Sequence, residues 1–259
     1  MKTLGLALGA GGSRGVAHIG FLKALEEAGI KPDYIVGSSM GSVVGGAYAA
    51  GVSLDAMKEA VCKLRLWDLI APAKQKGGVL GNSKMRNQIT KYIGDITFAD
   101  LKIPFHCVAV DMVAQEVVEF SEGNVVDAIV ASSSIPAVFH PLIKDGKRLI
   151  DGGVLERVPA MRVKKLGADV VVAVDVLGWR SASEKVPGAI GISLETFDIM
   201  DNYRTREYHK KHKKDIDFWL EPDLGDMSQY SLKQIKEAYE KGYELGKANV
   251  AAIQKALED

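Results

Sequence analysis

The feature that most constrains this chain is the stretch 34–44, where an apolar strand turns abruptly into a helix of small residues. Ser39 lies at the bend, with Gly37 and Gly41 around it at the G-x-S-x-G spacing. A serine on so sharp a turn requires neighbours that lack a Cβ. The helix ends at Gly51, a residue type that commonly adopts the left-handed conformation at a helix stop. The stretch therefore predicts a hydroxyl held out at the carboxyl end of a buried strand.

That position suits a nucleophile. Backbone N–H groups at the start of the following helix favour the negative charge that develops when a serine attacks an acyl group. Glycine and serine are also common in ordinary turns, so the motif taken alone fits a plain turn as well. The rest of the chain has to decide between the two interpretations.

Composition indicates an ordinary globular protein. The chain has 259 residues, of which 47% are hydrophobic and 25% charged, and 33 basic side chains balance 33 acidic ones. This length accommodates one large α/β domain or two small ones, and the lack of a repeat or linker in the sequence favours a single domain over 1–259. Zero formal net charge gives no attraction to nucleic acid or to an anionic bilayer.

The cysteines and the amino terminus bear on location. Cys62 and Cys107 stand far apart in apolar surroundings and are predicted to be buried thiols, because a disulfide framework or metal cluster needs more of them. Residues 4–10 are apolar but short and broken by glycine, which favours a buried first strand over a signal peptide. No uninterrupted apolar run has the length of a membrane span. We expect a cytoplasmic protein, with peripheral contact to a membrane left open.

The order of predicted elements indicates an α/β fold. A strand over 3–9, a glycine-rich loop, a helix over 16–28 and the strand before Ser39 make a βαβ unit, which implies parallel strands. Pairing of 105–113 with the alternating segment 115–120 adds an antiparallel part. The other predicted elements are helices near 53–65, 83–93, 124–134, 158–166, 189–211 and 231–257, and strands at 148–150, 169–177 and 216–220.

Donors for an oxyanion are predicted in the glycine-rich loop. Gly11, Gly12, Ser13 and Arg14 lie at the end of the strand next in sequence to that of Ser39, and glycines there let backbone N–H groups approach closely. Such a loop is also what a nucleotide phosphate site uses. However, Arg14 stands where the third glycine of a dinucleotide fingerprint belongs, and the sequence has no G-K-[ST] of a P-loop. We therefore do not expect nucleotide binding.

A proton acceptor for Ser39 is harder to find, and Asp151 is the best candidate. It follows a predicted strand, and Gly152 and Gly153 after it allow close backbone approach. An ordinary aspartate, with a pKa near 3.9, is a weak base, so the site has to raise this pKa or tighten the hydrogen bond during the reaction. By itself Asp-Gly-Gly fits a turn. The histidines fit packing positions, turns or a solvated helix end; they are His18, His106, His140, His209 and His212.

Four motifs follow one another along the chain, and together they are far more specific than any one of them. They are Gly11-Gly12-Ser13-Arg14-Gly15, Gly37-Ser38-Ser39-Met40-Gly41, Ala131-Ser132-Ser133-Ser134-Ile135-Pro136 and Asp151-Gly152-Gly153. In this order and at these separations they resemble the patatin-like phospholipase family. The resemblance covers about 3–177, and the remainder, 178–259, is less diagnostic. A compact chain of this kind is similar to the bacterial members related to neuropathy target esterases.

The resemblance implies a three-layer α/β/α fold with a mostly parallel central sheet. It also implies a Ser-Asp dyad without histidine, with Ser39 as nucleophile and Asp151 as base, that cleaves fatty-acyl esters of lipids. No metal or organic cofactor is needed, and the sequence has no calcium-ligand loop. The oxyanion hole implied is formed by backbone N–H groups of Gly11, Gly12 and neighbouring Ser13 or Arg14. The glycines expected to support the two motifs are Gly37, Gly41, Gly152 and Gly153.

Several features leave alternatives open. Arg14 either places its charge near a lipid phosphate or braces the loop through a carbonyl. Residues 131–136 and Phe139 are expected to line or support the acyl pocket. Segment 66–81 fits a lid, a membrane contact or a dimer contact, and the oligomeric state stays open. The alternative function is a lipid-binding or regulatory protein with little turnover, and the intact serine and aspartate favour the enzyme.

Overall fold

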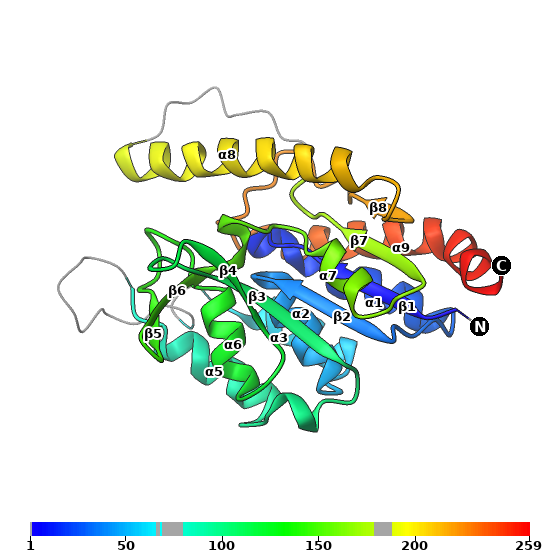
Figure 1. The fold of residues 1–259 in the computed structure, drawn as a ribbon, viewed down its shortest axis with the longest axis horizontal. Coiled ribbons are helices and arrows are strands. Elements are labelled where there is room, and N and C mark those ends of the chain that lie inside the picture. The colour runs from blue at the N-terminus through cyan, green and yellow to red at the C-terminus, as the bar shows by residue number, and fades with distance from the viewer. Residues whose placement is uncertain (1, 66–67, 69–79, 179–187) are drawn as a thin grey trace.

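The computed structural model describes residues 2–65, 68, 80–178 and 188–259 (Figure 1). The strands are β1 Leu4–Leu8, β2 Tyr34–Ser38, β3 Phe105–Asp111, β4 Glu116–Phe120, β5 Leu142–Lys144, β6 Lys147–Asp151, β7 Val170–Val174 and β8 Phe218–Leu220. Within the described residues they form one sheet with the order β5-β6-β3-β2-β1-β7-β8, and β4 pairs with β3 outside this path. The run from β3 through β2, β1 and β7 to β8 is parallel, whereas β4 and β6 pair antiparallel with β3. The predicted mixed, mostly parallel sheet is confirmed.

Helices cover both faces of the sheet, as a three-layer α/β/α fold requires (Figure 1). The α-helices are α1 Ala17–Glu27, α2 Met40–Ala49, α3 Leu54–Lys63, α5 Ser83–Ile93, α6 Val125–Ser132, α7 Ala160–Lys165, α8 Ala189–His212 and α9 Ile235–Glu258. Short 3-10 turns are η1 Gly12–Val16, η2 Phe98–Asp100 and η3 Gly152–Val154. The larger core joins α1, α2, α3, α5, α6 and α9 to one face, and a smaller core holds α7 and Tyr208 of α8 on the other.

Alternation along β1 separates the two cores. Leu4, Leu6 and Leu8 point into the larger core, and Ala7 points into the smaller one. At Gly5 a Cβ would lie 2.0 Å from Val163 Cγ1, so α7 packs almost directly on the backbone of the strand. Small residues on this face therefore let α7 come close, while large ones build the core on the other side.

Strand register brings the ends of β2 and β6 together. Ser38, the last residue of β2, pairs with Val108 on one side of β3. Asp151, the last residue of β6, pairs with Ala109 on the other side. Strands β2 and β6 both pair with β3, so Asp151 and the residue that follows Ser38 are separated by only one intervening strand. Neighbouring strands lie about 5 Å apart, so the distance across that strand is short. The sheet alone thus places Ser39 within side-chain reach of Asp151.

Most predicted elements are present, with ends that differ by a few residues. Ser53 caps α3 and Asn124 caps α6 through their side-chain oxygens. The prediction that both cysteines are buried is right for Cys107 and wrong for Cys62. On α3 the buried side chains are those of Leu54 and Met57, so Cys62 is left on the solvent side of the helix.

Two predicted loops lie largely outside the described residues. Of the segment 66–81, predicted as a lid or contact surface, only 68 and 80–81 are described, and 179–187 of the loop before α8 are likewise outside. Leu80 exchanges backbone hydrogen bonds with the 138–140 segment, so this end of the first loop is joined to the body of the protein. Among the described residues, no helix combines the length and apolar character needed to cross a bilayer.

Candidate active site

Ser39 occupies the sharp turn between β2 and α2. Its φ and ψ of 52° and −121° lie in a region that non-glycine residues rarely adopt, so the turn holds the backbone in a strained conformation. A Cβ at Gly37 would lie 2.5 Å from Ser42 Cα, and one at Gly41 would lie 2.0 Å from the Leu8 carbonyl oxygen. Both flanking glycines are therefore sterically required, as the motif predicts.

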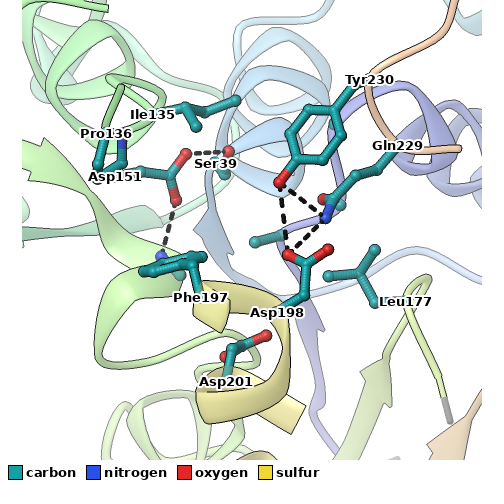
Figure 2. A pocket seen from close by; sticks show the side chains of 14 residues that line it. Ser39, Ile135, Pro136, Asp151, Leu177, Phe197, Asp198, Asp201, Gln229 and Tyr230 are labelled. Carbon is teal, nitrogen blue, oxygen red and sulfur yellow. Dashed lines mark hydrogen bonds between the residues drawn. The ribbon is translucent and has the colours of Figure 1, made fainter. Parts of the chain in front are cut away.

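The structure brings Ser39 and Asp151 into direct contact. The Ser39 hydroxyl donates a hydrogen bond of 2.5 Å to Asp151 Oδ2, and the Gly153 N–H donates one of 2.8 Å to Asp151 Oδ1 (Figure 2). Gly152 permits this approach, because a Cβ there would lie 2.3 Å from the Val108 carbonyl oxygen. Both carboxylate oxygens are thus fixed, one toward the serine and one toward the backbone.

Burial makes Asp151 a stronger base than an ordinary aspartate. Desolvation is the largest effect and raises the pKa of this carboxyl to about 7. The hydrogen bonds from Ser39 and Gly153 oppose the rise, and the negative charge of Asp201 adds to it. A carboxylate with a pKa close to neutral can accept a proton from a serine hydroxyl and return it to a leaving group.

The last residue of α6 and the segment that follows it hold both residues of the pair. The Ser39 N–H donates to Ser132 Oγ at 2.9 Å, and the Asp151 N–H donates to the Ser134 carbonyl at 3.0 Å. Ile135 and Pro136 line the pocket beside the pair (Figure 2). The predicted acyl-pocket segment therefore both lines the site and fixes the two side chains relative to one another, whereas Phe139 belongs to the larger core.

The residues of the glycine-rich loop fall into two groups, those that line the pocket and those whose N–H groups bond to backbone carbonyls. Gly11 and Gly12 line the pocket together with the serine and the aspartate. The N–H of Ser13 donates to the Gln229 carbonyl at 2.9 Å, and the N–H of Arg14 donates back to the Gly11 carbonyl at 3.0 Å. Gly12 has a φ of 50°, and a Cβ there would lie 2.3 Å from the Gln229 carbonyl oxygen. Of the four predicted oxyanion residues, two face the pocket and two donate within the framework.

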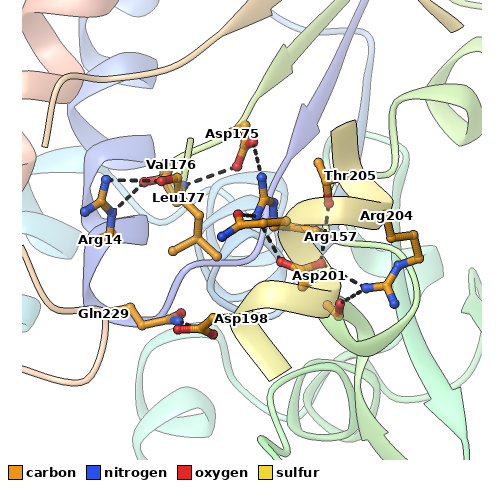
Figure 3. A network of polar contacts seen from close by, with 12 residues as sticks. Arg14, Arg157, Asp175, Val176, Leu177, Asp198, Asp201, Arg204, Thr205 and Gln229 are labelled. Atoms are coloured by element: carbon orange, nitrogen blue, oxygen red, sulfur yellow. Dashed lines mark hydrogen bonds and ion pairs between the residues drawn. The ribbon is translucent and has the colours of Figure 1, made fainter. Parts of the chain in front are cut away.

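Arg14 braces the loop, which is one of the two roles left open by the sequence. Its Nε donates to the Val176 carbonyl at 2.8 Å, and its Nη2 donates to the Leu177 carbonyl at 3.3 Å (Figure 3). Its Nη1 donates to the carbonyls of Gly225 and Met227 at 3.0 and 2.9 Å. The guanidinium, in a side chain that is almost fully buried, thus ties the first loop to the end of β7 and to the loop before α9.

None of the histidines takes part in the described contacts of Ser39. His18 is fully buried, its Nε2 bonds the Gly9 carbonyl, and burial lowers its pKa to about 4. His106 pairs with Glu119, and His209 stacks on Trp219. Within the described ranges, no three His, Cys, Asp or Glu side chains converge in a way that would hold a metal ion.

Comparison with known proteins identifies the family. The family model described as patatin-like phospholipase matches residues 6–164, more than half of the chain. The chain belongs to the patatin-like phospholipase family. The predicted resemblance is therefore confirmed, and the matched segment includes all four motifs that suggested it.

Curated relatives of this family member carry related names. An uncharacterized NTE family protein of Mycobacterium tuberculosis H37Rv is 39% identical over 176 residues, which cover 67% of this chain and 49% of the relative. Lysophospholipase NTE1 of Coccidioides immitis is 34% identical over 210 residues, which cover 78% of this chain and 13% of the fungal protein. The chain thus spans about half the length of the mycobacterial relative and a small part of the fungal one.

Solved structures show the same fold for this patatin-like phospholipase family member. VipD from Legionella pneumophila superposes with a TM-score of 0.68 at 13% identity, over 97% of this chain and 67% of VipD. The type III effector protein ExoU superposes with a TM-score of 0.52 at 15% identity, over 99% of this chain and 54% of ExoU. At such low identity the likeness concerns the fold alone.

Part of the pocket wall lies beyond the family match, in the region that the sequence marked as less diagnostic. The described residues that supply this wall are Leu177, Phe197, Asp198, Asp201, Gln229 and Tyr230 (Figure 2). Asp198 accepts hydrogen bonds from the Gln229 amide at 2.9 Å and the Tyr230 hydroxyl at 3.4 Å. The chain after β7 therefore returns to the site and covers one side of it.

A buried ion-pair network anchors α8 beside the site. Arg157 contacts Asp175 at 2.6 Å and Asp201 at 3.0 Å, and Asp201 also pairs with Arg204 at 2.9 Å (Figure 3). Arg204 in turn donates to the carbonyl of Gly153, whose N–H donates to Asp151. Sequence analysis missed this network, since no local pattern marks residues that pair across such long separations.

Proposed function

We propose that this protein is a serine acyl hydrolase, a carboxylic ester hydrolase of the phospholipase A or lysophospholipase type that cleaves fatty-acyl esters of lipids. The observation that carries the proposal is the 2.5 Å hydrogen bond from the Ser39 hydroxyl to the buried carboxylate of Asp151. Membership of the patatin-like phospholipase family and the name of the fungal relative support the same substrate class.

The reaction follows from the two side chains. Ser39 Oγ attacks the ester carbonyl carbon, and its proton passes to Asp151 Oδ2. The tetrahedral intermediate expels the alcohol, which takes that proton from Asp151, and the acyl group stays on the serine. Water then attacks the acyl-serine, again giving a proton to Asp151. The fatty acid leaves, and the proton returns to Ser39 Oγ.

Two features assist this reaction. Gly11 and Gly12 line the pocket, and their backbone N–H groups are the proposed donors to the oxyanion. Asp151, whose pKa burial raises to about 7, is ionised for a large part of the time at neutral pH and still basic enough to take the proton. Removing one such oxyanion donor commonly costs about a hundredfold or more in kcat.

A fluorophosphonate probe tests the nucleophile. We expect the probe to label the wild-type protein and to leave Ser39→Ala unlabelled. Ser38→Ala is the matched control, because Ser38 is the adjacent buried serine and its Oγ has no hydrogen-bond partner among the described residues. Labelling that persists in Ser39→Ala would remove the assignment of the nucleophile.

Turnover separates the enzyme from the alternative, a lipid-binding or regulatory protein. Steady-state hydrolysis of short p-nitrophenyl esters by the wild-type protein, and its loss in Ser39→Ala, is expected for the enzyme. A panel of lysophospholipids and diacyl phospholipids then determines head group, acyl length and regiochemistry. Probe labelling without steady-state turnover on any of these esters would favour the alternative.

A further inference from the structure

Helix α8 buries polar side chains and exposes large apolar ones, whereas an ordinary surface helix buries its apolar stripe and exposes its polar side. Inside, Asp201 and Thr205 are each only 4% exposed. The side chains that define the outer apolar face are Ile192, Ile199, Met200 and Tyr203, exposed to 50%, 61%, 63% and 70%. At about 3.6 residues per turn, Ile192, Ile199 and Tyr203 lie along one line of the helix, with Met200 beside it.

The buried contacts of α8 keep this face outward. Asp201 is held by Arg157 and Arg204, and Tyr208 accepts a hydrogen bond of 2.8 Å from the Met161 N–H. Turning the apolar side chains inward would break these contacts and leave buried charges without partners, which is strongly unfavourable. The apolar face is therefore a fixed property of the surface.

Basic side chains extend the same surface. Along the helix, Arg206 and Lys210 continue the line of Ile199 and Tyr203, and both are exposed. Further exposed lysines follow directly, at Lys211, Lys213 and Lys214, against the acidic Glu207 and Asp215. The whole chain has equal numbers of acidic and basic residues, and so does α8 itself, so the local excess of positive charge belongs to the stretch 206–214.

The outer apolar face adjoins the proposed active site through the thickness of one helix. Phe197, Asp198 and Asp201 of α8 line the pocket that holds Ser39. A helix is about 10 Å across with its side chains, so a surface in contact with the outer face lies close to the pocket. Figure 1 shows α8 on the outside of the molecule, along one border of the ribbon.

We propose that the outer apolar face of α8, together with the basic stretch 206–214, docks on the surface of an anionic phospholipid bilayer. Exposed apolar side chains beside lysine and arginine are the combination by which helices lie in a bilayer interface, with apolar contacts and attraction to anionic lipids acting together. The docking places the pocket next to a lipid phase that holds acyl esters. This inference goes beyond the proposed function, because it concerns where the protein meets lipid and does not depend on turnover.

Vesicle sedimentation in a Ser39→Ala background tests docking without hydrolysis. We expect binding to phosphatidylcholine vesicles that contain phosphatidylserine, and a fall of roughly tenfold or more in the partition coefficient for Ile199→Ser/Met200→Ser/Tyr203→Ser. The matched control is Ile143→Ser on β5, since Ile143 is exposed to 58% on another element and its loss should leave binding unchanged. If the triple variant fails to fold, the single change Ile199→Ser is expected to act in the same direction.

The charge component has its own test. Lys211→Gln/Lys214→Gln is expected to weaken binding several-fold per lysine on vesicles with phosphatidylserine, with little effect on pure phosphatidylcholine and a smaller effect at high salt. Equal vesicle binding by the parent and the triple serine variant would overturn the proposal. It would also be overturned if the parent bound no vesicles and sedimentation velocity showed a dimer that the triple variant loses. Hydrolysis of soluble esters by the wild type is measured separately, so failure of docking and failure of the proposed function are distinguishable.

Discussion

Two carboxylates that line the same pocket have opposite surroundings. Asp151 and Asp201 are 6% and 4% exposed, so both are removed from water to a similar degree. In the described structure Asp151 accepts from two neutral donors, the Ser39 hydroxyl and the Gly153 N–H. Asp201 accepts from the guanidinium groups of Arg157 and Arg204.

The difference assigns the two groups to different tasks. Burial raises the pKa of both carboxyls; for Asp201 the charges of Arg157 and Arg204 oppose that rise, and for Asp151 only hydrogen bonds do. A carboxylate held by two cations is a poor proton acceptor and a good anchor. A desolvated carboxylate without a cation is a base, and the same chemical group thus serves as proposed base in one place and as support for α8 in the other.

The largest expected effect is on turnover, and it separates the two carboxylates directly. Asp151→Asn keeps the shape of the side chain but removes the proton acceptor, so kcat/KM for a p-nitrophenyl ester should fall about a thousandfold or more. Asp201→Asn is the matched control and should cost less than about tenfold, since it leaves Ser39 and its partner in place. Equal losses for the two variants would remove the distinction between base and anchor.

The ion pairs that hold Asp201 are expected to affect the stability of the fold more than the catalytic rate. Arg157→Met leaves Asp175 and Asp201 buried without their shared cation, so the free energy of unfolding in urea should fall by about 3–5 kcal/mol. Neutralising both acids as well, in Arg157→Met/Asp175→Asn/Asp201→Asn, should recover a large part of this loss because no isolated charge remains. If Arg157→Met alone were as stable as the wild type, the ion-pair network would not be needed to hold the fold.

The pKa of Asp151 also predicts how stability depends on pH. Between about pH 4 and pH 7 the folded protein keeps a proton on Asp151 that the unfolded chain releases, so this group stabilises the fold at low pH and that contribution is lost as pH rises through 7. Relative to Asp151→Asn, the wild type should therefore lose up to about 4 kcal/mol of unfolding free energy across this window and change little above it. Urea unfolding of both proteins at each pH measures the difference, and a constant difference would contradict the raised pKa.

Sequence predicts the site of Ser39 and Asp151 well because its signals are local. Gly37 is required by contacts within the strand-turn-helix unit itself, and Gly41 by the backbone of the neighbouring strand β1. Asp151 ends a strand whose register follows from a short Asp-Gly hairpin. The caps at Ser53 and Asn124 likewise act within three residues of themselves. Where the cause of a structure lies a few residues away, the pattern of residues reveals it.

The ion-pair network, the role of α8 and the exposure of Cys62 were not predicted, because they depend on residues that are distant in the chain. Arg157 finds Asp175 and Asp201 at separations of 18 and 44 residues, and no periodicity records such pairs. Helix α8 was predicted in position but not in role, since polar Asp201 and Thr205 are buried on its inward side among apolar residues and interrupt the usual apolar stripe. Cys62 was misassigned because apolar neighbours in sequence do not show which side of a helix faces the core.

The smallest expected effect concerns the interaction between the two carboxylates. The negative charge of Asp201 raises the pKa of Asp151, so Asp201→Asn should move the acid limb of the kcat/KM profile to lower pH. The freed charge of Arg157 acts in the same direction, and the combined shift should be roughly one pH unit or less, which corresponds to about 1.4 kcal/mol at most.

The direction of that shift is the informative result, because a general loosening of the site would lower the rate without moving the limb in a defined sense. Asp55→Asn is the control: this exposed carboxylate on α3 pairs with Lys23 on the opposite face of the sheet and should leave the limb in place. A limb that moves to higher pH in Asp201→Asn would mean that Asp201 stabilises the Asp151 carboxylate through the Arg204 and Gly153 contacts more than it opposes it by charge. In that case Asp201 would help to set the basicity of Asp151 as well as holding α8 in place.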